Sequence, residues 1–448
     1  MRRTRNALTA GLGVVVATAA LGACGGEDSP GTESGGRSAA DGRWGLAPQP
    51  PKSVSGYQGV SAHVVDGLIT VVAEVDYDQA SVKVITYDPS ENRWTTEGDP
   101  AIWWRFGSAR VATDDEIILH GGCCGPAGSG SRAPGFAYDP RRDRWREIAA
   151  GPLGNRFGHA GVWTGRRVIF WGGSDGEVHE DGAAYDPEAD AWRRIAPAPI
   201  KAREDHASVW TGEEMIVWGG GCGEHECRDG AAYDPASDSW RQITDAPMGG
   251  YAHSAVWTGH EMIVWGGSDD YEAEGSFGFP RRFLNTGFAY EPASDSWRAL
   301  APAPLDPRGW HSAVWTGQEM LVWGGVESPC TTAPCESYPA DAAAYDPVAD
   351  AWREIALGPL SGRVDHSAVW TGQHMVVWGG SPPGGGLAYD DGALYEPKAD
   401  SWRELPAAPI EARYRHAALW TGSEMVIWGG ERGDGGSFAD GAAFRLQA

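Results

Sequence analysis

The fold is decided by a stretch that the chain repeats: residues 311–325 read HSAVWTGQEMLVWGG, and residues 366–380 read HSAVWTGQHMVVWGG. Related stretches begin at His159, His206, His253 and His416. All but the last are followed by Tyr-Asp-Pro or Tyr-Glu-Pro and then by a Trp, which recurs about every 50 residues. A period of this length predicts one structural unit that is stacked many times.

Each unit divides into four short apolar runs, which we name strands a to d. In the unit that starts at His311, strand a is HSAVW, strand b is EMLVW, strand c ends at Tyr345 and strand d carries Trp352. Short apolar runs between turn signals such as Thr-Gly and Gly-Gly predict strands. Strands that are apolar on both faces belong to sheets covered on both sides. The sequence therefore predicts an all-β protein built from four-stranded sheets.

This unit resembles the kelch repeat, whose members form β-propellers with four-stranded blades around an axis. The resemblance covers residues 41–448, and it implies a single propeller domain over that range. Seven Gly-Gly pairs recur in register after strand b, and they begin at Gly121, Gly172, Gly219, Gly266, Gly324, Gly379 and Gly429.

The number of blades follows from eight strand-d tryptophans: Trp44, Trp94, Trp145, Trp192, Trp240, Trp297, Trp352 and Trp402. The first unit, residues 53–100, lacks the Gly-Gly pair, and the last stops after strand c. Residues 41–50 match a strand d, so we predict that they supply the outer strand of the blade formed by residues 410–448. Such a strand closes the ring. We expect eight blades, with seven as the alternative.

The first 40 residues have the features of an export signal and a linker. Arginines near the start precede an apolar run over residues 7–21, which is too short to span a bilayer. The tetrad Leu21-Gly22-Ala23-Cys24 resembles the lipobox of bacterial lipoproteins. This resemblance implies a signal peptide over residues 1–23 and lipid attachment at Cys24, on the extracytoplasmic face of a membrane. Ordinary secretion is the alternative. Residues 24–40 are predicted to be a flexible tether.

The formal net charge is −25, which disfavours nucleic acid as a partner. We expect a monomer that binds a protein or glycan ligand, without a cofactor or a metal ion. The d–a and b–c loops share one face of a propeller, and the longest b–c loops span residues 268–287, 326–340 and 381–392. Variable loops on a rigid scaffold are where function usually lies. In kelch proteins this face generally engages partners or substrates.

An arginine recurs in the d–a loops, at Arg105, Arg156, Arg203, Arg308, Arg363 and Arg413. Tyr251, Trp310 and Tyr414 stand at or beside these positions, and together with the arginines they are the predicted ligand-binding residues. Guanidinium groups gathered on one face bind carboxylates, sulfates or acidic sugars. The alternative is that each arginine pairs with an acid of its own or the next blade. We favour pairing, because a residue found in most repeats usually serves the repeat.

Histidines begin strand a in six units: His159, His206, His253, His311, His366 and His416. They do not predict a metal site, because packed sheets lie about 10 Å apart whereas zinc needs nitrogens at about 2.0–2.1 Å. We expect them to be buried between blades with backbone partners.

Six cysteines other than Cys24 fall in b–c loops. Outside the cytoplasm, Cys222–Cys227 and Cys330–Cys335 are predicted to form local disulfides. Cys222, His225 and Cys227 could instead bind a metal ion. The adjacent Cys123 and Cys124 are either a vicinal disulfide or free thiols, and the sequence leaves this open.

Two classes of function fit the sequence. The first is a binding or scaffolding propeller. The second is a carbohydrate-active enzyme, because some kelch-type propellers are galactose oxidases or sialic acid epimerases. Galactose oxidases bind copper partly through histidines, but no His here departs from the repeat as such a ligand would. No nucleophile elbow or His-Glu-x-x-His motif is present. Aspartates such as Asp186 and Asp190 recur in c–d turns, where we expect them to cap the turns. Binding is therefore the first hypothesis.

Overall fold

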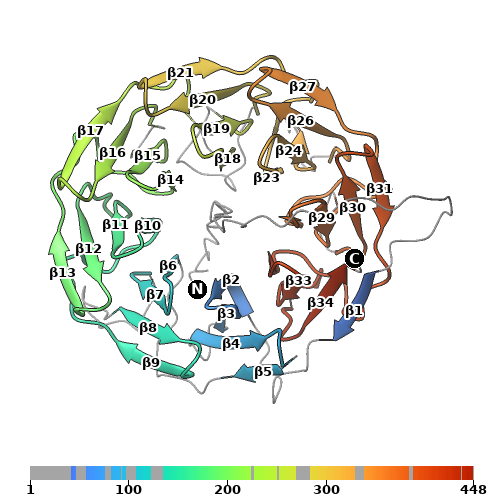
Figure 1. Cartoon of the computed structure of the whole chain (residues 1–448), viewed down its shortest axis with the longest axis horizontal. Helices are drawn as coiled ribbons and strands as arrows, with labels where there is room; N and C mark the ends of the chain where they lie inside the picture. Colours follow the sequence, from blue (N-terminus) through green and yellow to red (C-terminus); the bar gives the residue numbers. More distant parts are fainter. Residues whose placement is uncertain are drawn as a thin grey trace, which may run out of the picture.

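The computed structural model describes residues 42–46, 57–75, 82–91, 93–96, 107–122, 135–222, 227–249, 252–268, 283–327, 338–382, 387–434 and 436–446. These residues form eight four-stranded antiparallel sheets, arranged as the blades of a closed ring (Figure 1). The eight-bladed all-β propeller is confirmed, and the seven-bladed alternative is wrong. The predicted signal peptide, Cys24 and the tether lie outside the described residues.

We number the blades in chain order. Blade 1 consists of β2 (Tyr57–Val65), β3 (Leu68–Val75), β4 (Val82–Asp88) and β5 (Arg93–Thr96). Blade 2 consists of β6 (Ala109–Ala112), β7 (Ile117–His120), β8 (Phe136–Asp139) and β9 (Arg144–Glu147). Blade 3 consists of β10 (Ala160–Trp163), β11 (Val168–Trp171), β12 (Gly182–Asp186) and β13 (Ala191–Arg194). Blades 4 and 5 consist of β14 (Ala207–Trp210), β15 (Met215–Trp218), β16 (Gly230–Asp234) and β17 (Ser239–Ile243); and β18 (Ser254–Trp257), β19 (Met262–Trp265), β20 (Gly287–Glu291) and β21 (Ser296–Ala299).

The remaining blades follow the same plan. Blade 6 consists of β23 (Ser312–Trp315), β24 (Met320–Trp323), β26 (Ala342–Asp346) and β27 (Ala351–Glu354), with a short ladder of β22 (Arg308–Gly309) and β25 (Val326–Glu327). Blade 7 consists of β28 (Ser367–Trp370), β29 (Met375–Trp378), β30 (Gly392–Glu396) and β31 (Ser401–Glu404). Blade 8 consists of β32 (Ala417–Trp420), β33 (Glu424–Trp428), β34 (Gly441–Leu446) and β1 (Gly42–Leu46).

The core is divided among the junctions between blades. Where blade 3 meets blade 4, for example, Ile169 and Trp171 pack against Met215 and Tyr233. A cluster of this kind lies at each of the eight junctions, including the one where blade 8 meets blade 1. Because strand b is apolar on both faces, each blade buries one face against each neighbour, and the ring has no exposed apolar end.

The chain ends meet in one sheet. Strand β1 pairs antiparallel with β34, from Gly42 opposite Leu446 to Leu46 opposite Ala442. The Trp44 ring lies 5.0 Å from Phe444 and 6.1 Å from Trp378 between ring centroids. In Figure 1, β1 lies beside β34. The predicted closing strand is therefore confirmed over residues 42–46.

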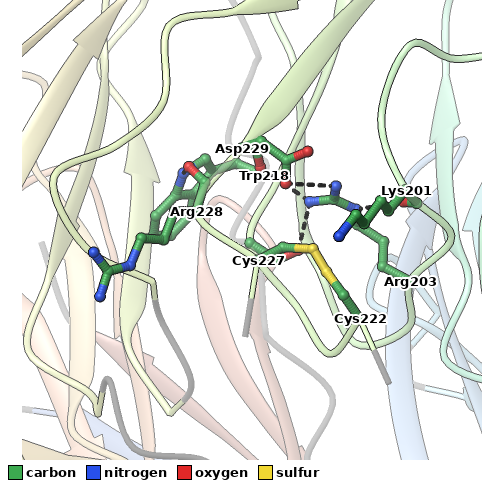
Figure 2. The surroundings of a disulfide bond; sticks show 8 residues. Lys201, Arg203, Trp218, Cys222, Cys227, Arg228 and Asp229 are labelled. Carbon is green, nitrogen blue, oxygen red and sulfur yellow. Dashed lines mark hydrogen bonds and ion pairs between the residues drawn. A yellow bond between two sulfur atoms is a disulfide. The ribbon is translucent and has the colours of Figure 1, made fainter. Parts of the chain in front are cut away.

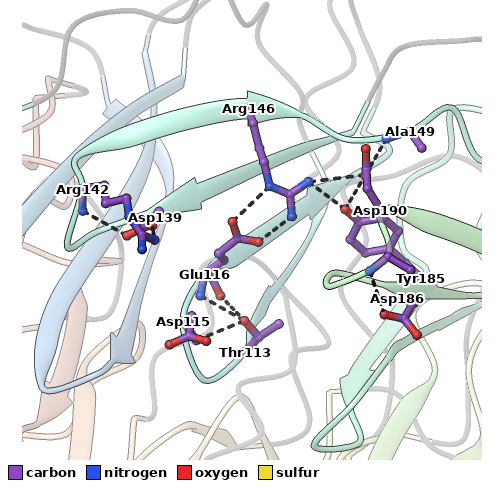
Figure 3. Close-up of polar contacts among 11 residues, drawn as sticks. Thr113, Asp115, Glu116, Asp139, Arg142, Arg146, Ala149, Tyr185, Asp186 and Asp190 are labelled. Atoms are coloured by element: carbon purple, nitrogen blue, oxygen red, sulfur yellow. Dashed lines mark hydrogen bonds and ion pairs between the residues drawn. The ribbon is translucent and has the colours of Figure 1, made fainter.

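Polar contacts also join the outer parts of neighbouring blades (Figure 3). Arg146 Nε and Nη2 donate to the carboxylate of Glu116 at 3.0 and 2.6 Å, and Nη1 donates to the Tyr185 hydroxyl of blade 3 at 2.9 Å. Asp190 accepts from the Tyr185 hydroxyl and from the Ala149 amide of blade 2. This aspartate of the c–d turn thus holds its own blade and the preceding one together.

Candidate functional site

The arginines of the d–a loops lie inside the blades. Arg156 is 3% exposed, and Arg203, Arg308, Arg363 and Arg413 are fully buried. Each pairs with an aspartate that precedes strand c of its own blade; the partners are Asp181, Asp229, Asp341, Asp391 and Asp440. Figure 2 shows the pair formed by Arg203 and Asp229, in which Arg203 Nη2 lies 2.7 Å from Asp229 Oδ1.

The same arginines also join one blade to the next. Arg413 Nη1 donates to the Gly429 carbonyl of blade 8 at 2.9 Å, while the Arg413 carbonyl accepts from the Gly380 amide of blade 7 at 2.9 Å. These contacts are the ones expected if each arginine pairs with an acid of the ring instead of binding a ligand. The five guanidiniums therefore lie within the blades and are not part of the exposed surface of this face. Arg105 lies outside the described residues.

The strand-a histidines lie between the blades, and three of them share hydrogen bonds with serine side chains. The His416 ring packs edge-on against Trp378 of blade 7, and its Nε2 shares a hydrogen bond with the Ser367 hydroxyl at 2.8 Å. His311 and His366 make the equivalent bond to a serine of the preceding blade. Burial lowers the pKa of His311, His366 and His416 to about 3. Neutral imidazoles therefore pack here as part of the junction.

The predicted disulfide between Cys222 and Cys227 is confirmed (Figure 2). Both sulfurs lie close to the Asp229 carboxylate, so these three residues form a group with metal-ligand chemistry. However, the sulfurs are bonded to each other, and Asp229 pairs with Arg203. The Cys330–Cys335 pair, Cys123, Cys124 and His225 lie outside the described residues.

The variable chemistry of the d–a face lies immediately before strand a. We call the residue that precedes the strand-a histidine in blades 3 to 8 the axial rim: Gly158, Asp205, Ala252, Trp310, Asp365 and Arg415. All six have a φ between 50° and 63°. Backbone bonds join neighbouring members, as when the Arg415 amide donates to the Asp365 carbonyl at 3.0 Å. Because strand a is innermost in each blade, the rim surrounds the axis of the ring.

One part of the axial rim holds a charged and aromatic cluster. Arg415 Nε lies 3.2 Å from Asp365, and its Nη1 lies 3.6 Å from Glu431. The guanidinium also lies 5.6 Å from the centre of the Tyr414 ring. Burial raises the pKa of Asp365, and Arg415 opposes that effect. The side chain of Arg415 is 45% exposed, so this charge remains open to solvent.

Another part carries carboxylates without a cation. Glu204 and Asp205 form no ion pair with any residue that the structure describes. Burial is the first cause that raises the pKa of each, and the charge of Asp205 raises that of Glu204 further. A Cβ added to Gly158 would lie 2.8 Å from Asp205 Oδ1, so the glycine leaves room for this carboxylate.

Two of the predicted aromatic residues belong to this region. Trp310 is a rim residue whose ring contacts Phe283, and Tyr414 stands beside Arg415. Tyr251 lies outside the described residues. Asp205, Asp365 and Arg415 were not predicted from the sequence. The signal for them was present, because the two positions between the recurring arginine and histidine vary from repeat to repeat, as in REDH, RGWH, RVDH and RYRH.

Comparisons with known proteins agree with this architecture. Residues 205–430 match the family model described as the KLHDC2/KLHL20/DRC7 Kelch-repeats domain, and residues 74–278 match the model described as the Attractin/LZTR1 beta-propeller. The first match covers half of the sequence, and the chain belongs to the kelch-repeat family of β-propellers. A search of curated proteins found no match. Within the described ranges, no helix has the length and apolar character needed to cross a membrane.

Proposed function

We propose that this protein is a binding or scaffolding propeller that engages its ligand at the axial rim, on the face of the d–a and b–c loops. The kelch-repeat fold suggests a protein-binding scaffold in general. Our proposal adds that the mature chain is held by a lipid at Cys24 on the extracytoplasmic face of a membrane. It also adds that the chain is monomeric and that its ligand is a protein, with a glycan as the second choice.

The observation that carries the proposal is the variety of the axial rim within a repeated scaffold. The neighbouring histidine and Gly-Gly recur in all six of these blades and the arginine in five of them, whereas the rim residues are Gly, Asp, Ala, Trp, Asp and Arg. A left-handed backbone costs an L-residue about 1–2 kcal/mol, and Gly would avoid that cost. Trp310 and Arg415 accept it, with φ values of 50° and 53°. Strained backbone of this kind tends to occur where side chains have a function.

A protein ligand is favoured by the residue types at the rim. The residues that dominate binding energy in protein interfaces are enriched in Trp, Tyr and Arg, and Trp310, Tyr414 and Arg415 lie on one face of this propeller. The partly exposed cation of Arg415 and the carboxylates of Glu204 and Asp205 give the rim both signs of charge. Such a pattern sets orientation and specificity more than raw affinity.

The test is a binding screen of the purified ectodomain against envelope proteins, peptidoglycan fragments and a glycan array. A rim variant that combines Asp205→Ala, Trp310→Ala and Arg415→Ala should lower the affinity for the ligand by at least about a hundredfold. Truncating a hot-spot residue commonly costs more than about 1 kcal/mol of binding free energy. The matched control combines Gln318→Ala and Gln373→Ala in exposed a–b turns of the opposite face. If only the control variant loses the ligand, the site is on the other face.

The membrane anchor has its own test. Intact mass spectrometry of the membrane-extracted protein should show cleavage before Cys24 and an added lipid mass. Cys24→Ser should release the protein from the membrane. A native protein that is soluble after export, with no lipid mass, would support ordinary secretion instead.

An enzyme is the second candidate, and one observation favours it. The pKa values of Glu204, Asp205 and Asp365 are all raised, with burial as the first cause in each case, and a general acid needs such a shift. Metal analysis and a turnover assay with oligosaccharides separate the two classes. Turnover that is lost in Asp205→Asn, or stoichiometric copper or zinc, would support the enzyme.

A further inference from the structure

The opposite face, where the a–b and c–d turns lie, contains an arginine whose contacts differ from those of the equivalent arginines in four other blades. Four blades share one arrangement, in which a strand-d arginine is held by the glutamate that ends its own a–b turn and by a tyrosine of the next blade. These sets are Arg146, Glu116 and Tyr185; Arg241, Glu214 and Tyr290; Arg298, Glu261 and Tyr345; and Arg353, Glu319 and Tyr395.

The contacts of Arg353 show what this arrangement supplies. Its Nε and Nη2 donate to the two oxygens of Glu319 at 2.9 and 2.7 Å, and its Nη1 donates to the Tyr395 hydroxyl at 3.0 Å. A carboxylate thus meets the planar edge of the guanidinium with two parallel bonds, which is the strongest pairing available to arginine. The Arg146 example in Figure 3 has the same geometry.

At the junction of blades 7 and 8 the arginine remains, but its partners change. Arg403 is opposite Leu394, in the register that Arg353 has with Ala344. The a–b turn keeps its backbone, because the amide of residue 374 donates to Thr371 Oγ1 at 2.9 Å, but the residue there is His374 instead of Glu. Phe444 has the register of the tyrosine and lacks its hydroxyl.

These substitutions leave two nitrogens without partners. Arg403 Nε and His374 Nδ1 are both buried and have no hydrogen-bond partner among the residues that the structure describes. The two side chains are close enough that Arg403 lowers the pKa of His374, although burial lowers it more, and Glu396 acts in the opposite direction. Positive charge and donor capacity therefore meet at this junction, and among the described residues Glu396 is an acid that acts on His374.

We propose that Arg403, with His374 beside it, is a binding site for a carboxylate group on the face opposite the axial rim. The ligand group takes the role that glutamate has in the four complete junctions. It is a carboxylate and not a phosphate, because the repeats pair this guanidinium with a planar carboxylate and because Glu396 and a net charge of −25 disfavour a dianion. The carboxylate belongs either to a protein side chain or to a small organic acid. This site does not depend on the function proposed above.

The test is a titration of the full-length chain followed by the arginine Nε–H signals in ¹H–¹⁵N NMR. Arg403→Lys assigns the signal by removing it. Sodium acetate, compared with sodium chloride at equal ionic strength, should shift the Arg403 signal to saturation. The Arg353 signal serves as an internal control, because Arg353 Nε already donates to Glu319 at 2.9 Å.

Variants at His374 give the decisive comparison. His374→Glu recreates the pair of the other blades and should weaken acetate binding by about tenfold or more, since an internal carboxylate competes for the same donors. His374→Gln should leave binding within about threefold, because it adds no charge. A blocked peptide with one Glu, compared with its Gln counterpart, distinguishes a protein side chain from a small acid. An unsaturable shift, an equal response to chloride, or unchanged binding in His374→Glu would overturn the proposal.

Discussion

Trp44 Nε1 donates a hydrogen bond to the carbonyl oxygen of Pro406 at 2.8 Å, across 362 positions of sequence. Trp402 makes the same bond to Ala356 at 2.7 Å, and Trp352 makes it to Ala301 at 2.9 Å. In each case the strand-d tryptophan of one blade is held by the residues that follow strand d of the preceding blade. The junction closed by the N-terminal strand therefore has the same tryptophan hydrogen bond as junctions within the continuous chain.

Trp44→Ala should destabilise the protein by about 2–4 kcal/mol, because it removes a large aromatic ring packed on Phe444 and Trp378 and also the bond to Pro406. Trp44→Phe keeps most of the packing and should cost about 1–2 kcal/mol. Urea unfolding followed by tryptophan fluorescence measures both variants. An unchanged midpoint for Trp44→Ala would mean that the N-terminal strand does not hold the ring closed.

The sequence was sufficient to predict the blades, their number and the closing strand, because these depend on residues that recur in register. Trp44 was recognisable by its match to Trp402, and the Cys222–Cys227 disulfide by its short spacing together with the predicted export signal. Periodicity alone identifies such features, since each repeat must present the same surface to its neighbours.

The candidate site was harder to predict, because a repeat pattern shows which residues recur but not which of them meet. The aspartates that pair with the arginines also recur, just before strand c, yet nothing in the linear pattern links Asp391 to Arg363, 28 positions earlier. Asp365 and Arg415 were overlooked for the opposite reason: they do not recur. Their contact joins two blades, so it exists only after those blades have packed against each other.

The buried arginines should matter for stability. Arg363→Met removes the bonds to Gly379 and Asp391 from a fully buried position. Because the Asp391 side chain is 50% exposed, we expect a loss of about 1.5–3 kcal/mol. The matched control is Arg194→Met, because Arg194 also pairs with an aspartate, Asp181, but its side chain is 59% exposed. This exposed pair should contribute less than about 1 kcal/mol. Equal losses in chemical denaturation would show that the buried pair has no special role in the junction.

Acid should unfold the protein well before its carboxylates titrate. His206, His311, His366 and His416 have a pKa of about 3 in the folded state, because burial disfavours the charged imidazole. Their usual pKa is about 6.5, so the unfolded chain binds protons that the folded chain does not. The stability from these groups is fully present above pH 6.5 and is lost as the pH falls from there toward 3.

Each such histidine should contribute a slope of about 1.4 kcal/mol per pH unit between pH 6 and 4. The measurement is the free energy of urea unfolding at pH 7, 6, 5 and 4.5. His206→Gln should reduce the slope by the contribution of one histidine. A stability that stays constant from pH 7 to 4.5 would contradict neutral, buried imidazoles.

The last prediction concerns the strain of the axial rim. Ala252 has a φ of 55°, so Ala252→Gly relieves about 1–2 kcal/mol of left-handed strain. The greater conformational freedom of Gly in the unfolded chain lowers the stability by about 0.5–1 kcal/mol. The net increase in the free energy of unfolding is therefore about 0.5–1 kcal/mol. The matched control is Ala255→Gly, three residues later in β18. It relieves no strain and should cost about 1 kcal/mol, because Ala255 is buried in an extended strand.

Arg415→Gly should likewise leave the fold stable while weakening the binding of the ligand, because Arg415 is strained and partly exposed. If Ala252→Gly destabilises the protein as much as Ala255→Gly does, the rim stores no strain, and the argument that its side chains are kept for binding fails.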